Sequence, residues 1–196
     1  MPRTTFVGML GVALAVAPSS GTGQDLPRVV IQTNLGAIEI EIDTVRAPGT
    51  GANFLRYVDA GYYTPGRFHR TVTPDNQPNN EVRIEVIQGG MERGTGLTPF
   101  APIALERTNV TGLAHRDGAI SVARGAPDSG RSDFFICIGD QPELDFGGKR
   151  NADGQGFAAF GRVVRGMDVV RRIQASTVDG QRLTPAVAIL STRRKE

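Results

Sequence analysis

The sequence predicts a mainly β domain in which short strands close into a barrel and a helix covers each open end. Two observations lead to this fold class. Short apolar runs, some alternating with polar residues, are separated by glycine and proline turn signals. Two isolated segments carry apolar residues at helical spacing instead. With 196 residues, 39% of them hydrophobic, the chain suits one such domain plus a short appendage.

The first two strands are predicted at residues 29–32 and 37–43, joined by a turn at 33–36. In the second strand β-branched residues alternate with carboxylates, which places the two kinds on opposite faces. The apolar set is Ile38, Ile40 and Ile42, and the carboxylates are Glu39, Glu41 and Asp43. A metal site is one interpretation of three carboxylates on a face. The solvated outer face of an antiparallel sheet is the one we favour.

Two helices are predicted. The first begins at Pro48, which suits the first turn of a helix, and ends at Gly61, which suits a left-handed residue beyond its last turn. Its apolar positions are Phe54, Leu55 and Val58. The second helix spans residues 166–174, and its apolar side carries Met167, Val170 and Ile173.

The remaining strands are predicted at residues 82–86, 118–124, 134–138, 157–164 and 186–191. We expect the Gln88-Gly89-Gly90 sequence to end the strand that begins at residue 82. Residues 71–80 contain two prolines and three asparagines and predict a surface loop or a loose hairpin tip. Residues 91–102 predict a loop, and residues 105–113 predict irregular structure.

The N-terminus predicts a cleavable secretion signal. Arg3 supplies a positive start, and residues 6–17 form an uncharged apolar run that is too short to span a membrane. Cleavage is expected after Ala17, near Ser20 or before Gln24. We therefore assign residues 1–23 to the signal and 24–196 to the mature domain, which would be periplasmic or secreted. An uncleaved anchor and an unstructured start are the alternatives.

Charge and cysteine content restrict the partners. Net charge is +2, and basic residues are dispersed except for Arg193-Arg194-Lys195, which predicts a solvated tail. We therefore expect no nucleic-acid binding, no stable membrane insertion of the mature domain, and a monomer. The single cysteine, Cys137, lies in an apolar run and predicts a small buried side chain. No internal disulfide can form.

One stretch, residues 68–90, stands out chemically. Arg70 directly follows two ring side chains, Phe68 and His69, and the stretch ends at Gln88-Gly89-Gly90. A guanidinium beside apolar side chains is either a surface ion-pair partner or a preorganised donor for a ligand carbonyl. On these three residues alone the surface interpretation is favoured, because most arginines are exposed. The rest of the chain reverses that order.

A set of short motifs along the chain resembles the cyclophilins, which are peptidyl-prolyl cis–trans isomerases. The resemblance covers about Val29 to Leu190, and Phe-His-Arg followed by Gln-Gly-Gly is its most specific part. In order, the motifs are Thr33-Asn34-x-Gly36, Ala47-Pro48, Asn53-Phe54, Gly61-Tyr62-Tyr63, Phe68-His69-Arg70, Gln88-Gly89-Gly90, Gly118-Ala119-Ile120-Ser121-x-Ala123, Phe134-Phe135-Ile136, Leu144-Asp145 and Phe160-Gly161-Arg162-Val163-x-x-Gly166-Met167.

The resemblance implies an eight-stranded antiparallel closed barrel capped by two α-helices. It also implies an isomerase of X-Pro bonds that needs no cofactor and no metal. Its catalytic residues would be Arg70 as donor to the twisted amide, Gln88 as its hydrogen-bonding partner and His69 in support. For Gln88, an amide that caps the glycine turn is the alternative.

The same resemblance implies a set of substrate-binding residues. They are Phe68, Val86, Ala123, Arg124, Phe135, Leu144 and Phe157. Phe135 would form the floor of the proline pocket, while Phe134 would point into the core because successive strand residues face opposite ways. Core aromatics are the alternative for Phe68 and Phe135, and ordinary sheet residues are the alternative for Ala123 and Arg124.

Five positions depart from the family pattern. Glu85 and Val86 stand where a Phe-Met pair is frequent, and Glu143 stands where tryptophan or tyrosine is frequent. Phe157 stands where histidine is frequent, and Asp133 stands where glutamine is frequent. Glu85 would neutralise the donor if it paired with Arg70. The expected function is an exported isomerase that assists the folding of extended, proline-containing polypeptides. A proline-peptide-binding chaperone with little or no turnover is the alternative.

Overall fold

The computed structural model describes residue 1 and residues 25–92 and 99–196. Apart from Met1, the expected signal peptide lies outside the described residues, and so does part of the loop expected at 91–102. None of the helices in the described ranges is both long and apolar enough to cross a membrane.

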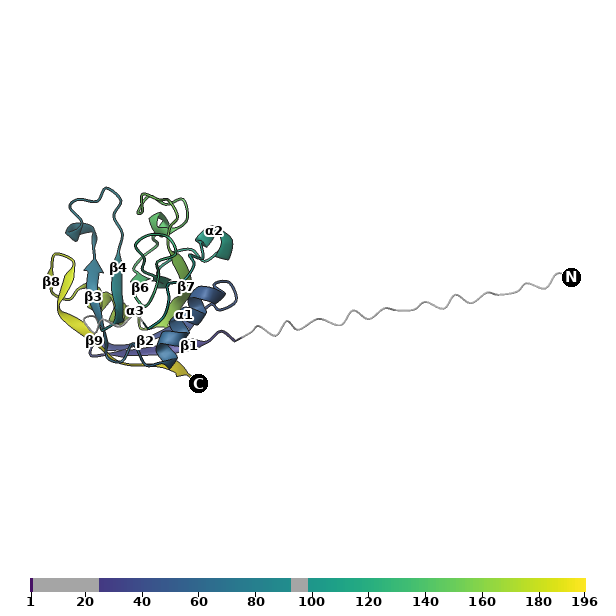
Figure 1. The fold of residues 1–196 in the computed structure, drawn as a ribbon, viewed down its shortest axis with the longest axis horizontal. Coiled ribbons are helices and arrows are strands. Elements are labelled where there is room, and N and C mark those ends of the chain that lie inside the picture. Colours follow the sequence, from purple (N-terminus) through teal and green to yellow (C-terminus); the bar gives the residue numbers. More distant parts are fainter. Residues whose placement is uncertain (2–24, 93–98) are drawn as a thin grey trace.

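The strands form a closed antiparallel ring (Figure 1). Around the ring the order is β1-β2-β7-β5-β6-β4-β3-β9, and β9 pairs with β1 to close it. The ninth strand, β8, pairs only with β9 and forms a hairpin outside the ring. The strands are β1 (Arg28–Thr33), β2 (Gly36–Ile42), β3 (Gly66–Val72), β4 (Val86–Met91), β5 (Ala119–Val122), β6 (Phe134–Cys137), β7 (Ala158–Arg165), β8 (Val178–Asp179) and β9 (Arg182–Lys195). The predicted eight-stranded closed barrel is confirmed.

Both predicted helices are present, as α1 (Pro48–Asp59) and α3 (Met167–Gln174). The Glu106 carboxylate accepts hydrogen bonds from the free N–H groups of Gly49 and Thr50, at 3.0 and 2.7 Å, and so caps the start of α1. A four-residue helix, α2 (Thr108–Thr111), lies in the segment expected to be irregular. Short 3₁₀ turns occur at Pro74–Asn76 and Pro142–Leu144.

The barrel interior is filled by apolar side chains from the strands and from α1 and α3. Phe134 lies at its centre, with edge-on ring contacts to Phe54 at 5.5 Å and to Phe68 at 5.7 Å. Such tilted and edge-on pairs are the favoured aromatic geometries. From α3, Val170 and Ile173 are fully buried in the same interior.

A second, smaller apolar cluster lies on the other face of the sheet and is called the outer cluster here. It consists of Val72, Ile84, Val86, Ala119, Phe135, Cys137 and Leu144, with Ala123 and Phe157 packed against it. Strand β6 separates the two: Phe134 and Ile136 face the interior, whereas Phe135 and Cys137 face the outer cluster. Cys137 is a free, buried cysteine, as predicted, and burial raises the pKa of its thiol.

Strand β4 differs from its prediction at both ends. It begins at Val86 rather than residue 82, because the Gln77 side chain takes both backbone groups of Ile84, with 2.8 Å to its carbonyl and 3.3 Å to its N–H. Gln88-Gly89-Gly90 lies within β4 instead of ending it. Glycine suits this strand because a Cβ on Gly89 would lie 2.9 Å from the Phe68 ring.

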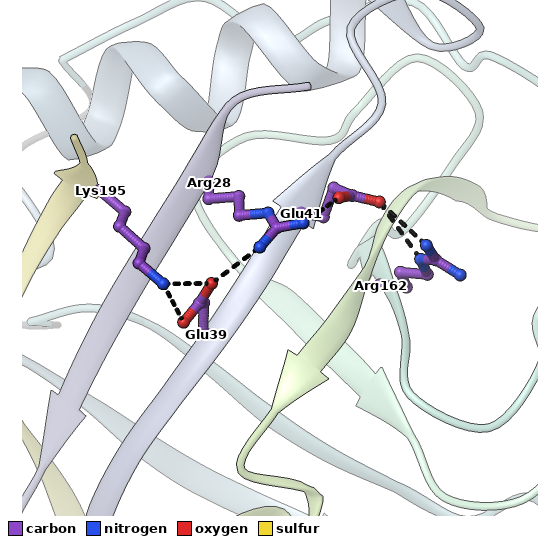
Figure 2. A network of polar contacts seen from close by, with 5 residues as sticks. All are labelled: Arg28, Glu39, Glu41, Arg162 and Lys195. Atoms are coloured by element: carbon purple, nitrogen blue, oxygen red, sulfur yellow. Dashed lines mark hydrogen bonds and ion pairs between the residues drawn. The ribbon is translucent and has the colours of Figure 1, made fainter. Parts of the chain in front are cut away.

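The carboxylates of β2 are not on a solvated face, which corrects the sequence-based expectation. Glu39 is only 7% exposed, and its carboxylate binds Lys195 at 2.8 Å and Arg28 at 3.3 Å. Glu41 joins Arg28 to Arg162 at 3.0 and 3.1 Å (Figure 2). The hydrogen bond from Lys195 lowers the pKa of Glu39. No metal-binding group of His, Cys, Asp or Glu occurs among the described residues.

The third carboxylate, Asp43, is likewise covered. It accepts hydrogen bonds from the backbone N–H of Arg46 at 2.8 Å and from its Nε at 2.7 Å. The basic residues 193–195 are exposed, as expected, but they do not form a tail, since Arg193 and Lys195 belong to β9 and pair in register with Val30 and Arg28 of β1. Cations and carboxylates on neighbouring strands therefore hold the barrel closed along this seam.

Candidate active site

A β-bulge in β3 sets the direction of Arg70. Phe68 is paired with Gly89 of β4, but Arg70 is paired with the adjacent Gln88, so β3 carries one extra residue here. The bulge breaks the alternation that would place positions 68 and 70 on one face. Phe68 is fully buried in the barrel interior, whereas Arg70 lies outside it and lines a surface cleft.

The Arg70 guanidinium is bound by two neutral amide oxygens. Its Nη1 donates to Gln88 Oε1 at 2.9 Å. Its Nε and Nη2 both donate to Gln181 Oε1, at 3.0 and 2.6 Å. Because a guanidinium has five N–H donors and these bonds engage three, two donors remain for a ligand. Gln181 was not among the predicted site residues, because it lies 111 residues from Arg70 along the chain and no local pattern links the two.

The Arg70 charge is not neutralised by an acid. Within the described ranges no carboxylate forms an ion pair with this side chain. Burial lowers the pKa of Arg70, and the nearby cation Arg150 lowers it further. An arginine remains protonated despite such shifts. The site therefore holds a partly buried positive charge that is fixed by dipoles alone.

Gln88 connects Arg70 to the other predicted catalytic residue. Its Oε1 accepts from Arg70, and its Nε2 donates to Asp133 Oδ2 at 3.5 Å. The same Asp133 oxygen lies 3.9 Å from His69 Nε2. This places Arg70, Gln88 and His69 in one polar group, with Asp133 between the histidine and the amide.

The apolar floor lies directly beside this polar group. Successive register partners run across the sheet from Arg70 on β3 to Gln88 on β4, then to Phe135 on β6 and Ser121 on β5. Neighbouring strands are about 4.8 Å apart, so the Phe135 backbone lies two strands, or roughly 10 Å, from that of Arg70. Donor, amide and aromatic floor thus form a row across the sheet.

Four further predicted substrate-binding residues surround Phe135. Val86 and Leu144 belong to the same outer cluster and are almost wholly buried. The Phe157 ring packs edge-on against Phe135, with centroids 5.2 Å apart and an interplanar angle of 86°. Ala123 packs on the cluster, and its N–H donates to the Asp133 carbonyl at 2.8 Å.

Two predicted substrate-binding residues are placed otherwise. Phe68 lies in the interior, on the opposite side of the sheet from Phe135. The Arg124 side chain is only 1% exposed and is turned toward a neighbouring loop. It donates to the Gly156 carbonyl at 2.7 Å and to both carboxylate oxygens of Asp153 at 2.8 and 2.9 Å. These bonds lower the pKa of Asp153 to about 2.

The Arg124 guanidinium also contacts Phe157, one of the predicted pocket residues. The guanidinium carbon lies 5.1 Å from the centre of the Phe157 ring, within range of a cation–π contact.

A buried polar group beneath the floor was not found from the sequence. His115 stacks on Phe135 with ring centroids 5.9 Å apart and planes 14° apart. Its Nδ1 lies 2.7 Å from Asp145 Oδ1, and its Nε2 lies 3.0 Å from Ser121 Oγ. Ser121 is fully buried, so it is not accessible as a nucleophile. The Leu144-Asp145 motif was the one sequence signal that could have pointed to His115. Asp145 binds His115, and Leu144 packs in the outer cluster.

The structure also shows the partners of Glu85 and Glu143, the two acidic residues that depart from the family pattern. Glu85 turns toward α3, where its Oε2 accepts a hydrogen bond from Gln174 Nε2 at 2.9 Å. It pairs with neither Arg70 nor Arg83 in the described structure. Glu143 accepts from the backbone N–H of Lys149 at 2.8 Å. Neither carboxylate neutralises the guanidinium.

Two clefts border the polar end of the row. One of about 990 Å³ lies between β3 and the β8–β9 hairpin and is lined by His69, Arg70 and Gln181 among others. A shallower hollow of about 350 Å³ includes Gln88, Ala123 and Asp133 in its walls. The two clefts thus reach Arg70 and Gln88, the two polar members of the row that face a ligand.

Comparisons with known proteins found a matching family model and several relatives of this chain. The family model described as "Cyclophilin type peptidyl-prolyl cis-trans isomerase/CLD" matches residues 28–194. A peptidyl-prolyl cis-trans isomerase of Acinetobacter baylyi is 39% identical over 152 residues, which cover 74% of this chain and 70% of that protein. Peptidyl-prolyl cis-trans isomerase B of Escherichia coli is 36% identical over 154 residues, covering 74% and 83%.

Among solved structures, a Cryptosporidium parvum cyclophilin type peptidyl-prolyl cis-trans isomerase, crystallised in the presence of the dipeptide Ala-Pro, matches with a TM-score of 0.70. The match covers 86% of this chain and 99% of that one at 22% identity. At this identity the likeness shows a common fold.

Proposed function

Because this chain belongs to the cyclophilin-type peptidyl-prolyl cis–trans isomerases, we propose that it isomerises X-Pro bonds at the row formed by Arg70, Gln88 and Phe135. The observation that carries this assignment is a guanidinium that two amides fix beside an apolar floor and that no acid among the described residues pairs with. A cationic donor and a place for a proline ring are the two requirements of the reaction.

The chemistry needs no covalent intermediate. Rotation about the peptide bond is opposed by about 18–20 kcal/mol of amide resonance. A catalyst must bind the twisted amide better than either planar isomer. In the twisted state the proline nitrogen regains a lone pair, and a cationic N–H can donate to it. One remaining donor of Arg70 serves that nitrogen, and the other can hold the proline carbonyl.

The outer cluster supplies the grip on the proline ring. Phe135 forms the floor, Leu144 and Val86 lie beside it, and Phe157 stands edge-on at the side. Burying the three methylenes of the ring is worth up to about 2.4 kcal/mol at roughly 0.8 kcal/mol each. The ring is then held while the residue before it rotates.

We also propose that the protein acts outside the cytoplasm on extended, proline-containing chains. An uncharged apolar run at residues 6–17, which follows Arg3, supports this location. N-terminal sequencing of the protein recovered from the periplasm or medium tests it. A mature N-terminus between residues 18 and 24 is expected, and retention of Met1 in the cytoplasm would refute it.

The assignment of Arg70 is tested by isomerisation of an X-Pro peptide with the parent, Arg70→Ala and Arg83→Ala. Arg83 is an exposed arginine and serves as the matched control. Loss of an electrostatic donor in a preorganised site costs about 10²–10³-fold in rate, so Arg70→Ala should fall to near the uncatalysed rate while Arg83→Ala stays within about twofold of the parent.

Two results would contradict the assignment. If Arg70→Ala were as active as the parent, the donor would have to be another group. If the parent bound the peptide without turnover, the protein would be a proline-peptide binder, which is the alternative that Glu85 and Glu143 suggest from the sequence.

A further inference from the structure

Gln181 makes more contacts with Arg70 than Gln88 does. It lies in the turn between β8 and β9, and its Oε1 accepts from both Nε and Nη2 of the guanidinium. Gln88 accepts a single bond from Nη1. The two amides approach different edges of the planar group. Together they fix its rotation about the last side-chain bonds, which one hydrogen bond alone would leave free.

The Gln181 side chain is itself held in place. Its Nε2 donates to the backbone carbonyl of Asn76 at 2.9 Å, and its own carbonyl accepts from the Thr71 N–H at 2.9 Å. The Asn76 side chain donates to the carbonyls of Thr71 and Gly180 at 3.1 and 3.2 Å. The asparagine-rich segment after β3 thus braces the hairpin that carries Gln181, and the oxygen of Gln181 is left to face Arg70.

We propose that Gln181 is a positioning residue for the isomerase reaction, which aims the two remaining donors of Arg70 at the bound prolyl amide. This inference rests on the proposed role of Arg70. A guanidinium free to rotate would spend little time with its donors at the twisted nitrogen, and a misplacement of about 1 Å can cost a hundredfold in rate.

Because the Gln181 side chain is uncharged, it also leaves the charge of Arg70 intact. A carboxylate at this position would form a bidentate ion pair with Nε and Nη2 and would share the charge that the substrate needs. Glutamine supplies the same acceptor geometry without that charge. The site therefore gains orientation while the cation keeps its full strength toward the developing lone pair.

The test compares Gln181→Met, Gln181→Glu and Gln32→Met with the parent. Methionine keeps the length of the side chain and removes the strong acceptor, and glutamate restores an acceptor. Gln32 lies on β1, and within residues 25–92 and 99–196 its side-chain amide bonds only to its neighbour Thr33, so it controls for glutamine loss. The readouts are kcat and KM for an X-Pro peptide, Tm, and the ¹⁵N–¹H resonance of Arg70 Nε, assigned with Arg70→Lys.

We expect Gln181→Met to lose about tenfold or more in kcat with KM within about twofold, because the lost interaction matters in the transition state. The Nε resonance should shift or broaden. Gln181→Glu should recover the resonance and part of kcat. Gln32→Met should match the parent in every readout.

Three outcomes would overturn the inference. The first is an unchanged kcat in Gln181→Met. The second is a loss of kcat that follows a loss of Tm and of peptide binding, which would mean that Gln181 only stabilises the fold. The third is an Arg70 Nε resonance that stays as shifted or broadened in Gln181→Glu as it is in Gln181→Met. If Arg70→Ala is inactive while Gln181→Met is normal, this inference fails and the proposed role of Arg70 stands.

Discussion

Replacing Phe135 with alanine should weaken both the fold and the grip on proline. The side chain is only 5% exposed and packs between the His115 ring and the Phe157 ring. Removing a buried phenylalanine costs about 3–5 kcal/mol, including the cavity that it leaves. For a domain of this size each kcal/mol shifts Tm by about 2–4 °C, so Tm should fall by roughly 6–20 °C.

The loss of the floor should also be visible in binding. The proline ring would keep the walls of the pocket but lose the aromatic surface beneath it, which is worth about 1–2 kcal/mol of the methylene burial worked out above. Peptide affinity should therefore fall about five- to thirtyfold. Titration of an X-Pro peptide by NMR at a temperature well below the lowered Tm measures this without interference from unfolding.

Two other phenylalanines serve as controls for the Phe135→Ala variant. Phe134→Ala should cost as much stability, because its ring is buried among interior aromatics, but it should leave peptide affinity nearly unchanged. Phe146→Ala should change neither, because that side chain is 45% exposed. If Phe135→Ala bound the peptide as well as Phe134→Ala does, Phe135 would not be the floor and the pocket would have to lie elsewhere.

Two further predictions concern the carboxylates. Glu85→Gln should leave kcat/KM within about twofold of the parent, because Glu85 bonds to Gln174 and not to Arg70; a severalfold gain in the isomerase assay would mean that its charge reaches the guanidinium. Glu39 has a lowered pKa in the folded state, so its stabilisation is present above the ordinary carboxylate pKa of about 4.3 and is lost as the pH falls through the folded value. Urea midpoints measured from neutral to acid pH should therefore fall less steeply in Glu39→Gln, and parallel curves would contradict this.

Sequence patterns were enough to predict most of the barrel. The alternation in β2, the apolar run of β6 and the helix signals at Pro48 and Gly61 all act within a few residues, and their elements form where expected. The resemblance named Arg70, Gln88 and Phe135, and the register places them in one row.

The sequence-based predictions fail where a side-chain contact or a bulge overrides the local pattern. The alternation at residues 82–86 predicts a strand, but Gln77 takes the backbone groups of Ile84 that a strand partner would need. Strand β3 was not recognised, because its bulge interrupts the period of two around Arg70. Gln181 gave no signal at all, since its role depends on a contact between residues 111 positions apart.

The pairing of β9 with β1 has a consequence for synthesis. Strand β9 is the last of the described strands, and it also pairs with β3, so both β1 and β3 have open edges until it arrives. A chain that does not yet include β9 carries exposed strand edges and cannot form the finished ring, and such edges invite aggregation. Closure of the ring thus depends on contacts between segments far apart in the sequence, which sets a slow pace for folding.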